Sequence, residues 1–166
     1  MTTALARFRH EKDSFLETDP DSPFHGGTSG SPYYAESDVY TVSAVLTRSA
    51  GREVMMLATS SGDEQPYFRV GRATFELDVH ACTPTLYQPT FETDSPRFFV
   101  PFQDKTSGSE TYGARCYLEA TLLSDGRVLL FNYAYSPFCA YLERFSCPLP
   151  PAENRLPVLI YAGEKL

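Results

Sequence analysis

Short segments in which apolar and polar residues alternate dominate the chain from residue 39 onward. In residues 73–79 (ATFELDV), Phe75, Leu77 and Val79 are predicted to point inward and the polar residues outward, as in a strand with one buried face. Turn residues interrupt this pattern every ~8–12 residues, and the strongest turn signal is Ser124-Asp125-Gly126. The predicted strands are residues 39–48, 52–60, 66–70, 73–79, 85–88, 98–102, 115–123, 127–134 and 157–162. We therefore expect an all-β, mainly antiparallel fold, a meandering β-barrel of about nine strands within residues 39–165.

One α-helix is predicted before the strands, over residues 4–18. Leu5, Phe8, Lys12 and Phe15 recur at a helical spacing, and the helix should end before Pro20, because the residue before a proline avoids the helical conformation. We expect the helix to pack against the barrel. Residues 135–156 have no strand pattern but many aromatic residues, which predicts a long ordered loop. The sequence shows no internal boundary, so residues 1–166 are predicted to form a single domain.

Composition argues against several classes of function. The formal charge is -7, from 21 acidic and 14 basic residues, and the basic residues form no run, which argues against nucleic-acid binding. No apolar run approaches the ~18 residues that span a bilayer, and the first residues lack the apolar stretch of a secretory signal. We therefore expect a cytoplasmic protein with no membrane partner. The four cysteines form no CxxC pair and the three histidines are scattered, so we expect no metal and no cofactor.

The loop at residues 103–113 (QDKTSGSETYG) gathers polar side chains around two glycines. Because backbone amides beside glycine can cradle an anion, the loop is a candidate binding site through Asp104, Thr106, Ser107, Glu110 and Tyr112. Asp104 and Glu110 are also candidates for an acid–base pair, since two close carboxylates raise the pKa of one of them, and Tyr112 could donate to an oxyanion. The alternative is a broad turn held by side-chain hydrogen bonds.

Polar residues at other turns and strand ends extend this candidate site. Asn132 lies in an apolar strand, where an amide either faces a polar cavity or has buried partners. Tyr135 begins a turn, and the prolines of CPLPP position Arg155, which could bind a carboxylate or phosphate in bidentate fashion or pair with Glu153. Together with Arg115, these residues are expected to converge with the 103–113 loop at one mouth of the barrel, a common ligand site.

Three functions remain open on these observations. The leading hypothesis is a barrel that binds a small polar or anionic ligand. The first alternative is a hydrolase or isomerase, in which Asp104 or Glu110 acts as general base and Arg155 binds the anionic group. The second alternative is a structural or interaction domain without a ligand, whose motifs lock a lid over the barrel.

Four ordered motifs carry a resemblance to a known family. They are RFFVPFQDKTSGSETYG (97–113), FNYAYSPFCAY (131–141), CPLPPAENRLP (147–157) and AGEK (162–165). In these motifs the chain resembles the uncharacterised bacterial and archaeal family catalogued as domain of unknown function 1684, a likeness that implies no activity. The chain departs from the family pattern where Arg115 stands one place early and Cys116 holds the usual arginine position. It also departs where Leu130, and not the aspartate of the family pattern, precedes Phe131-Asn132, and where Ser136 replaces an asparagine before Pro137.

Overall fold

The computed structural model describes residues 3–20, 33–92, 95–109, 116–131, 133–136 and 146–164. Its elements, in chain order, are α1 (Ala4–Thr18), the 3-10 helix η1 (Asp38–Tyr40), β1 (Thr41–Ala58), β2 (Glu64–Leu77), β3 (His80–Cys82), β4 (Thr85–Pro89), β5 (Arg97–Phe102), β6 (Cys116–Leu122), β7 (Arg127–Phe131) and the 3-10 helix η3 (Ala152–Asn154). The predicted helix over residues 4–18 is confirmed. In this part of the chain, no helix is long and apolar enough to cross a membrane.

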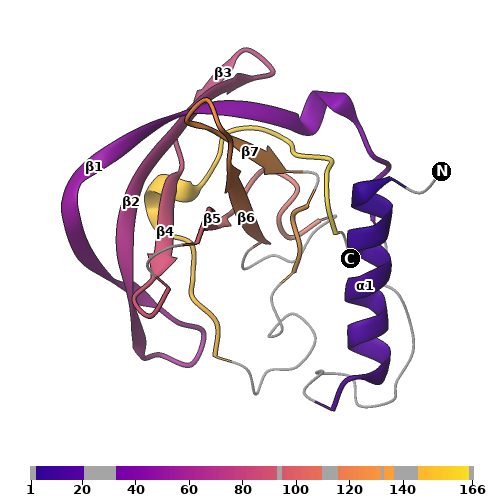
Figure 1. Cartoon of the computed structure of the whole chain (residues 1–166), viewed down its shortest axis with the longest axis horizontal. Helices are drawn as coiled ribbons and strands as arrows, with labels where there is room; N and C mark the ends of the chain where they lie inside the picture. Colours follow the sequence, from indigo (N-terminus) through magenta and orange to yellow (C-terminus); the bar gives the residue numbers. More distant parts are fainter. Residues whose placement is uncertain are drawn as a thin grey trace.

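The strands form one antiparallel sheet that closes on itself. Its order is β1-β7-β6-β5-β4-β2-β3, and β1 also pairs with β2. Strands β1, β7, β6, β5, β4 and β2 therefore form a closed ring, and β3 pairs with β2 alone among the described strands. Figure 1 shows β1 and β2 as long curved strands that sweep around one side, with α1 standing on the other side. The antiparallel β prediction is therefore confirmed, including the hairpin at residues 124–126. Consecutive strands are neighbours except that β4 pairs with β2 and not with β3.

The predicted number of strands is not what the structure shows, because the described residues form seven. Two pairs of predicted strands are each one continuous strand: 39–48 with 52–60 in β1, and 66–70 with 73–79 in β2. The β1–β2 register shifts between Arg48 and Glu53, and the β2–β4 register shifts between Arg69 and Gly71. A glycine at each interruption resembles a turn in the sequence, but here it marks a bulge that the partner strand runs past.

Two further differences concern strand ends. Val79, predicted to face inward, is 87% exposed and has a φ of 57°, because it lies in the turn between β2 and the unpredicted strand β3. Residues 157–162 are not a strand. This segment is bound to residues 103–105 by individual hydrogen bonds, such as the one that Lys105 N donates to the Val158 carbonyl at 2.8 Å. The predicted long loop at 135–156 is described only at residues 135–136 and 146–156.

The core fills the inside of the ring. It is built by inward-facing aliphatic and aromatic side chains of the strands and by the extended C-terminal segment, among them Leu86, Val100, Leu118, Val128 and Ile160, all at most 1% exposed. Asn154 of η3 joins two strands to this segment: its Oδ1 accepts from Thr85 N at 2.8 Å, and its Nδ2 donates to the carbonyls of Thr85 and Pro101 at 2.9 and 2.8 Å. The C-terminal segment is thus held by both apolar burial and buried hydrogen bonds.

Helix α1 packs against the side of the ring through one face. Thr3 caps its N-terminus by accepting from Ala6 N at 3.0 Å, which satisfies one of the helix's unpaired amides. Leu5 is buried, and the Phe8 ring lies 5.0 Å from that of Tyr133. Lys12, the one charged residue of the predicted apolar stripe, forms an ion pair of 2.7 Å with Glu164, so its position on the packed face has a partner.

Candidate functional site

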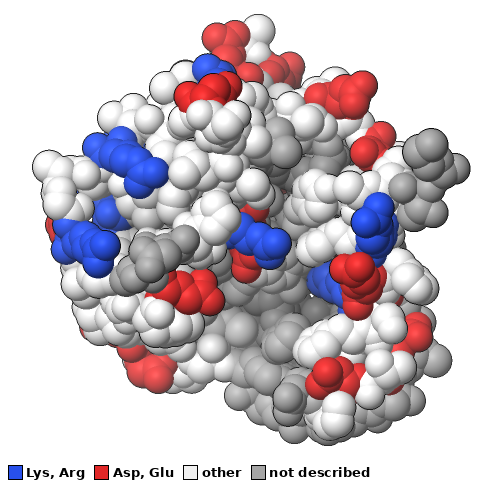
Figure 2. All heavy atoms as spheres, viewed as in Figure 1, with Lys and Arg blue, Asp and Glu red and all other residues white. Residues whose placement is uncertain are grey.

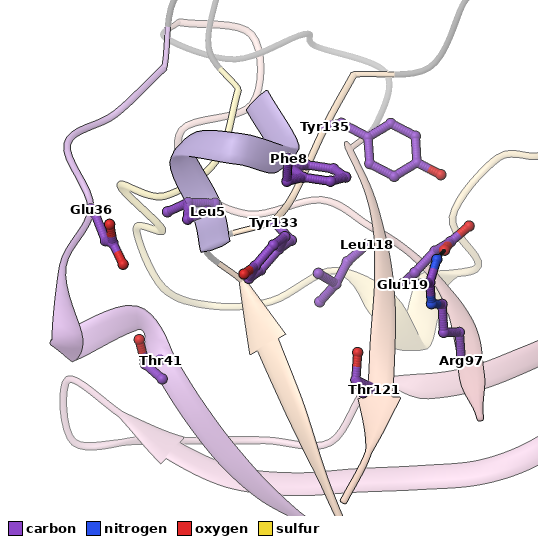
Figure 3. A pocket seen from close by; sticks show the side chains of 10 residues that line it. All are labelled: Leu5, Phe8, Glu36, Thr41, Arg97, Leu118, Glu119, Thr121, Tyr133 and Tyr135. Carbon is purple, nitrogen blue, oxygen red and sulfur yellow. Dashed lines mark ion pairs between the residues drawn. The ribbon is translucent and has the colours of Figure 1, made fainter. Parts of the chain in front are cut away.

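The wall of the ring opens between β6 and β7. These strands pair at Thr121 and Leu129, and the same register would bring Tyr117 opposite Tyr133. Tyr117 instead pairs with Tyr135, through two N–H···O=C bonds of 2.8 Å. The β7 side therefore carries two extra residues between these pairings, and Figure 3 shows the two strands diverging there with Leu118 between them.

A pocket of about 460 Å³ lies at this opening. Helix α1 supplies its apolar wall through Leu5 and Phe8, and Tyr133 and Tyr135 contribute aromatic rings (Figure 3). The polar lining comes from the segment that leads into β1 and from outward-facing positions of β5 and β6. The described polar residues of the lining are Glu36, Thr41, Arg97, Glu119 and Thr121.

The described lining of the pocket carries two carboxylates and one guanidinium. Arg97 and Glu119 form an ion pair of 3.7 Å, and their side chains are 67% and 49% exposed. Glu36 accepts from Thr3 Oγ1 at 3.2 Å. Burial, and then the charge of Glu119, raise the pKa of Tyr135 above its ordinary value. A tyrosine hydroxyl is already protonated at neutral pH and can donate a hydrogen bond.

Charge on the molecular surface is mixed around this region. Figure 2 shows acidic and basic side chains interspersed over the face that it presents, without a broad patch of either sign. Among the described residues, no three His, Cys, Asp or Glu side chains lie close enough to hold a metal ion. The chemistry available in the described lining is therefore apolar contact, hydrogen bonding and charge pairing with carboxylates or one guanidinium.

Asp104, Thr106 and Ser107 lie together and bind one another. Thr106 Oγ1 and Ser107 Oγ donate to Asp104 Oδ1 at 2.8 and 3.3 Å, and Ile160 N donates to Oδ2 at 2.6 Å. Burial raises the pKa of Asp104, and the hydrogen bond from Thr106 partly offsets this effect. Both oxygens of the carboxylate are therefore engaged in joining the loop to the C-terminal segment.

Of the remaining predicted residues, the structure describes two, Tyr135 and Arg155, and leaves four outside the described part of the chain. Tyr135 lines the pocket, to which Asp104, Thr106 and Ser107 do not contribute. Arg155 is exposed, and its backbone forms a parallel bridge with Gln103. Four predicted residues lie outside the described part of the chain: Glu110, Tyr112, Arg115 and Asn132. Their convergence, and the acid–base role of Glu110 and Tyr112, remain predictions.

Most of the pocket lining was missed by reasoning from the sequence. Glu119 and Thr121 alternate with core residues of β6, and such a pattern is that of any strand with one solvated face. Arg97 stands at the start of β5 in the same way. The only available signal was their proximity to the RFFVPF motif, because the opening between β6 and β7 and the packing of α1 both depend on contacts distant in sequence.

Comparisons with known proteins agree with the fold. A solved structure is similar along nearly the whole chain: the solution NMR structure of the uncharacterized protein from gene locus rrnAC0354 of Haloarcula marismortui. It is 35% identical in sequence, with a TM-score of 0.77, over 98% of this chain and 92% of that one. The comparison with curated proteins gives no match. A family model described as protein of unknown function (DUF1684) matches residues 28–165, so the chain belongs to the DUF1684 family.

Proposed function

We propose that this protein binds a small ligand with an apolar, ring-sized body and a neutral or cationic polar end, in the pocket between α1 and the opening of the ring. The observation that carries the proposal is the pocket itself, whose volume of about 460 Å³ falls within the ~300–1,000 Å³ of small-molecule sites. In this proposal the ring serves as the predicted barrel, and the ligand enters through the side wall.

The apolar part of the lining supports the first half of the proposal. Leu5, Phe8, Tyr133 and Tyr135 line the pocket (Figure 3), and the rings of Phe8 and Tyr133 contact each other with centroids 5.0 Å apart. Aromatic walls favour planar or ring-shaped ligands, because offset and edge-on ring contacts add about 0.5–1.5 kcal/mol to area burial. Tyr135 adds a hydrogen-bond donor at one end, which would orient a ligand with an acceptor or hydroxyl group.

The charged part of the lining supports the second half. Glu36 and Glu119 oppose the single guanidinium of Arg97, which is already paired with Glu119 at 3.7 Å. The described lining has one more negative than positive group, which repels an anionic ligand and attracts an ammonium group. The sequence prediction of a small polar ligand is therefore kept for this pocket, and its anionic variant is not.

Matched probes separate these possibilities. We expect 2-phenylethylamine and 2-phenylethanol to perturb the backbone amide NMR signals of Leu118 and Thr121, and 3-phenylpropanoate, which has a similar body and the opposite charge, to do so far more weakly. Glu119→Gln and Glu36→Gln should weaken binding of the amine about three- to tenfold, as expected for loss of a partly exposed charged hydrogen bond, and should leave the alcohol unaffected.

Glu64→Gln is the matched control, because Glu64 is an exposed carboxylate at the start of β2, away from the pocket lining. The proposal is wrong if none of the three probes shifts signals of the pocket lining. It is wrong about charge if the carboxylate binds as well as the amine, or if Glu64→Gln weakens the amine as much as Glu119→Gln does.

A further inference from the structure

A second polar groove lies where β2 changes register. Arg69 and Arg72 are three residues apart and would face opposite sides of a regular strand. The register shift between Arg69 and Gly71 brings both to one side, and the Nη2 atoms of both arginines reach the same oxygen, Oε2 of Glu153, at 3.7 and 3.1 Å. Bulges commonly re-aim a side chain in this way.

This groove has a volume of about 360 Å³ and is lined by cationic and hydroxyl-bearing residues. The described residues of the lining are Thr47, Arg48, Ser49, Arg69, Arg72, Thr74 and Thr83. None of these residues is acidic, and none belongs to the lining of the pocket beneath α1. Serine and threonine hydroxyls beside guanidinium groups are donors that suit the oxygens of a phosphate or carboxylate.

The arginines have donor capacity beyond Glu153. A guanidinium carries five N–H donors in a fixed fork, and Glu153 engages one nitrogen each of Arg69 and Arg72. The Nε of Arg69 is buried and has no hydrogen-bond partner among the described residues. Glu153 also accepts from the Tyr87 hydroxyl at 3.2 Å, which holds the carboxylate at the edge of the arginine pair. The groove therefore has an excess of positive charge together with an unused buried donor.

We propose that this groove is a binding site for a phosphate group, held by Arg69 and Arg72 with hydroxyls of the groove as further donors. Two arginines on one side can each offer parallel N–H donors to a tetrahedral oxyanion. Glu153 competes with the anion for the same guanidinium groups, so it lowers the affinity and keeps the arginines in place when the site is empty.

Titration of the full chain with inorganic phosphate and pyrophosphate, followed by isothermal calorimetry and by NMR signals of Arg69 and Arg72, tests the site. We expect saturable binding at millimolar or lower concentration, tighter for pyrophosphate. Arg72→Gln should weaken it about tenfold, as expected for loss of a charge-assisted hydrogen bond. Glu153→Gln should strengthen it, because the variant removes the competing charge while its amide oxygen still accepts from Tyr87.

Arg72→Gln makes the net charge more negative and Glu153→Gln makes it less negative, so a control variant with the same change of charge must separate a site from a general effect of net charge. Arg7→Gln, at an exposed position of α1, is the matched control and should leave binding unchanged. Acetate at equal ionic strength tests whether a carboxylate suffices. The inference is overturned if phosphate binding does not saturate, if Arg7→Gln weakens it as much as Arg72→Gln does, or if Glu153→Gln weakens it. Far-UV circular dichroism confirms that each variant is folded, and Arg69→Gln provides a second variant of the arginine pair.

Discussion

Replacing Lys12 with methionine tests how helix α1 is held to the ring. Lys12 Nζ lies 2.7 Å from Glu164 Oε2, and the two side chains are only 14% and 1% exposed. Glu164 also accepts from the backbone amide of Ser136 at 3.1 Å. Methionine keeps the length and apolar contacts of the lysine stem but removes the charge, so the variant leaves a carboxylate that is excluded from water and has lost its ion-pair partner.

Removing one partner of a buried ion pair typically costs about 3–5 kcal/mol. The Lys12 side chain as a whole is 14% exposed although its Nζ is buried, and we expect the lower end, about 3 kcal/mol. For a chain of 166 residues, at ~2–4 °C per kcal/mol, the midpoint of thermal unfolding should fall by about 10 °C. Urea unfolding followed by far-UV circular dichroism measures the free energy, and hydrogen exchange shows whether protection is lost first in α1.

Two further variants make the result decisive. Lys105→Met, at an exposed position, makes the same chemical change and should alter stability by less than about 0.5 kcal/mol. Adding Glu164→Gln to Lys12→Met should recover part of the loss, because the buried charge is then gone as well. The reasoning is refuted if Lys12→Met costs no more than Lys105→Met, or if the double variant is less stable than Lys12→Met alone.

Three other substitutions test the loops that the ring holds. Burial raises the pKa of Asp104 above 3.8 in the folded state. The stability that Asp104 contributes is therefore complete below that pH and is lost as pH rises through the folded pKa. In urea unfolding, the stability difference between wild type and Asp104→Asn should shrink as pH rises. Asn154→Ala should cost about 3 kcal/mol or more in the same assay, because three buried hydrogen bonds of Asn154 are lost. Gly163→Ala should lower the thermal midpoint by several degrees, since Gly163 has a φ of 78° and a Cβ there would lie 2.3 Å from the Ala134 carbonyl oxygen; an unchanged midpoint would contradict this geometry.

Local signals in the sequence were sufficient for the helix and for most strand positions. The spacing of Leu5, Phe8 and Phe15 and the stop before Pro20 depend on neighbours within a few residues. The number of strands could not be predicted from local sequence, because a glycine at a bulge and a glycine at a turn look alike until the partner strand is known. Residues 49–52 are a bulge only because β2 continues beside them.

The candidate site was harder to predict for the same reason. Asp104 was recognised as a polar residue in a rigid loop, but the Ile160 amide that it binds comes from the C-terminal segment. Among the predicted residues that the structure describes, only Tyr135 lines the pocket. Glu119 and Thr121 acquire a role only through the divergence of β6 from β7 and the packing of α1, and neither event leaves a local pattern.

The pairing of Lys12 with Glu164 has a consequence for how the chain is made. At ~5–20 residues per second, a ribosome adds Glu164 roughly 8–30 s after Lys12. During that interval the apolar face of α1 lacks the carboxylate that fixes it, and β1 lacks the strand β7 that completes the ring. We therefore expect the nascent chain to leave Leu5 and Phe8 uncovered for most of its synthesis.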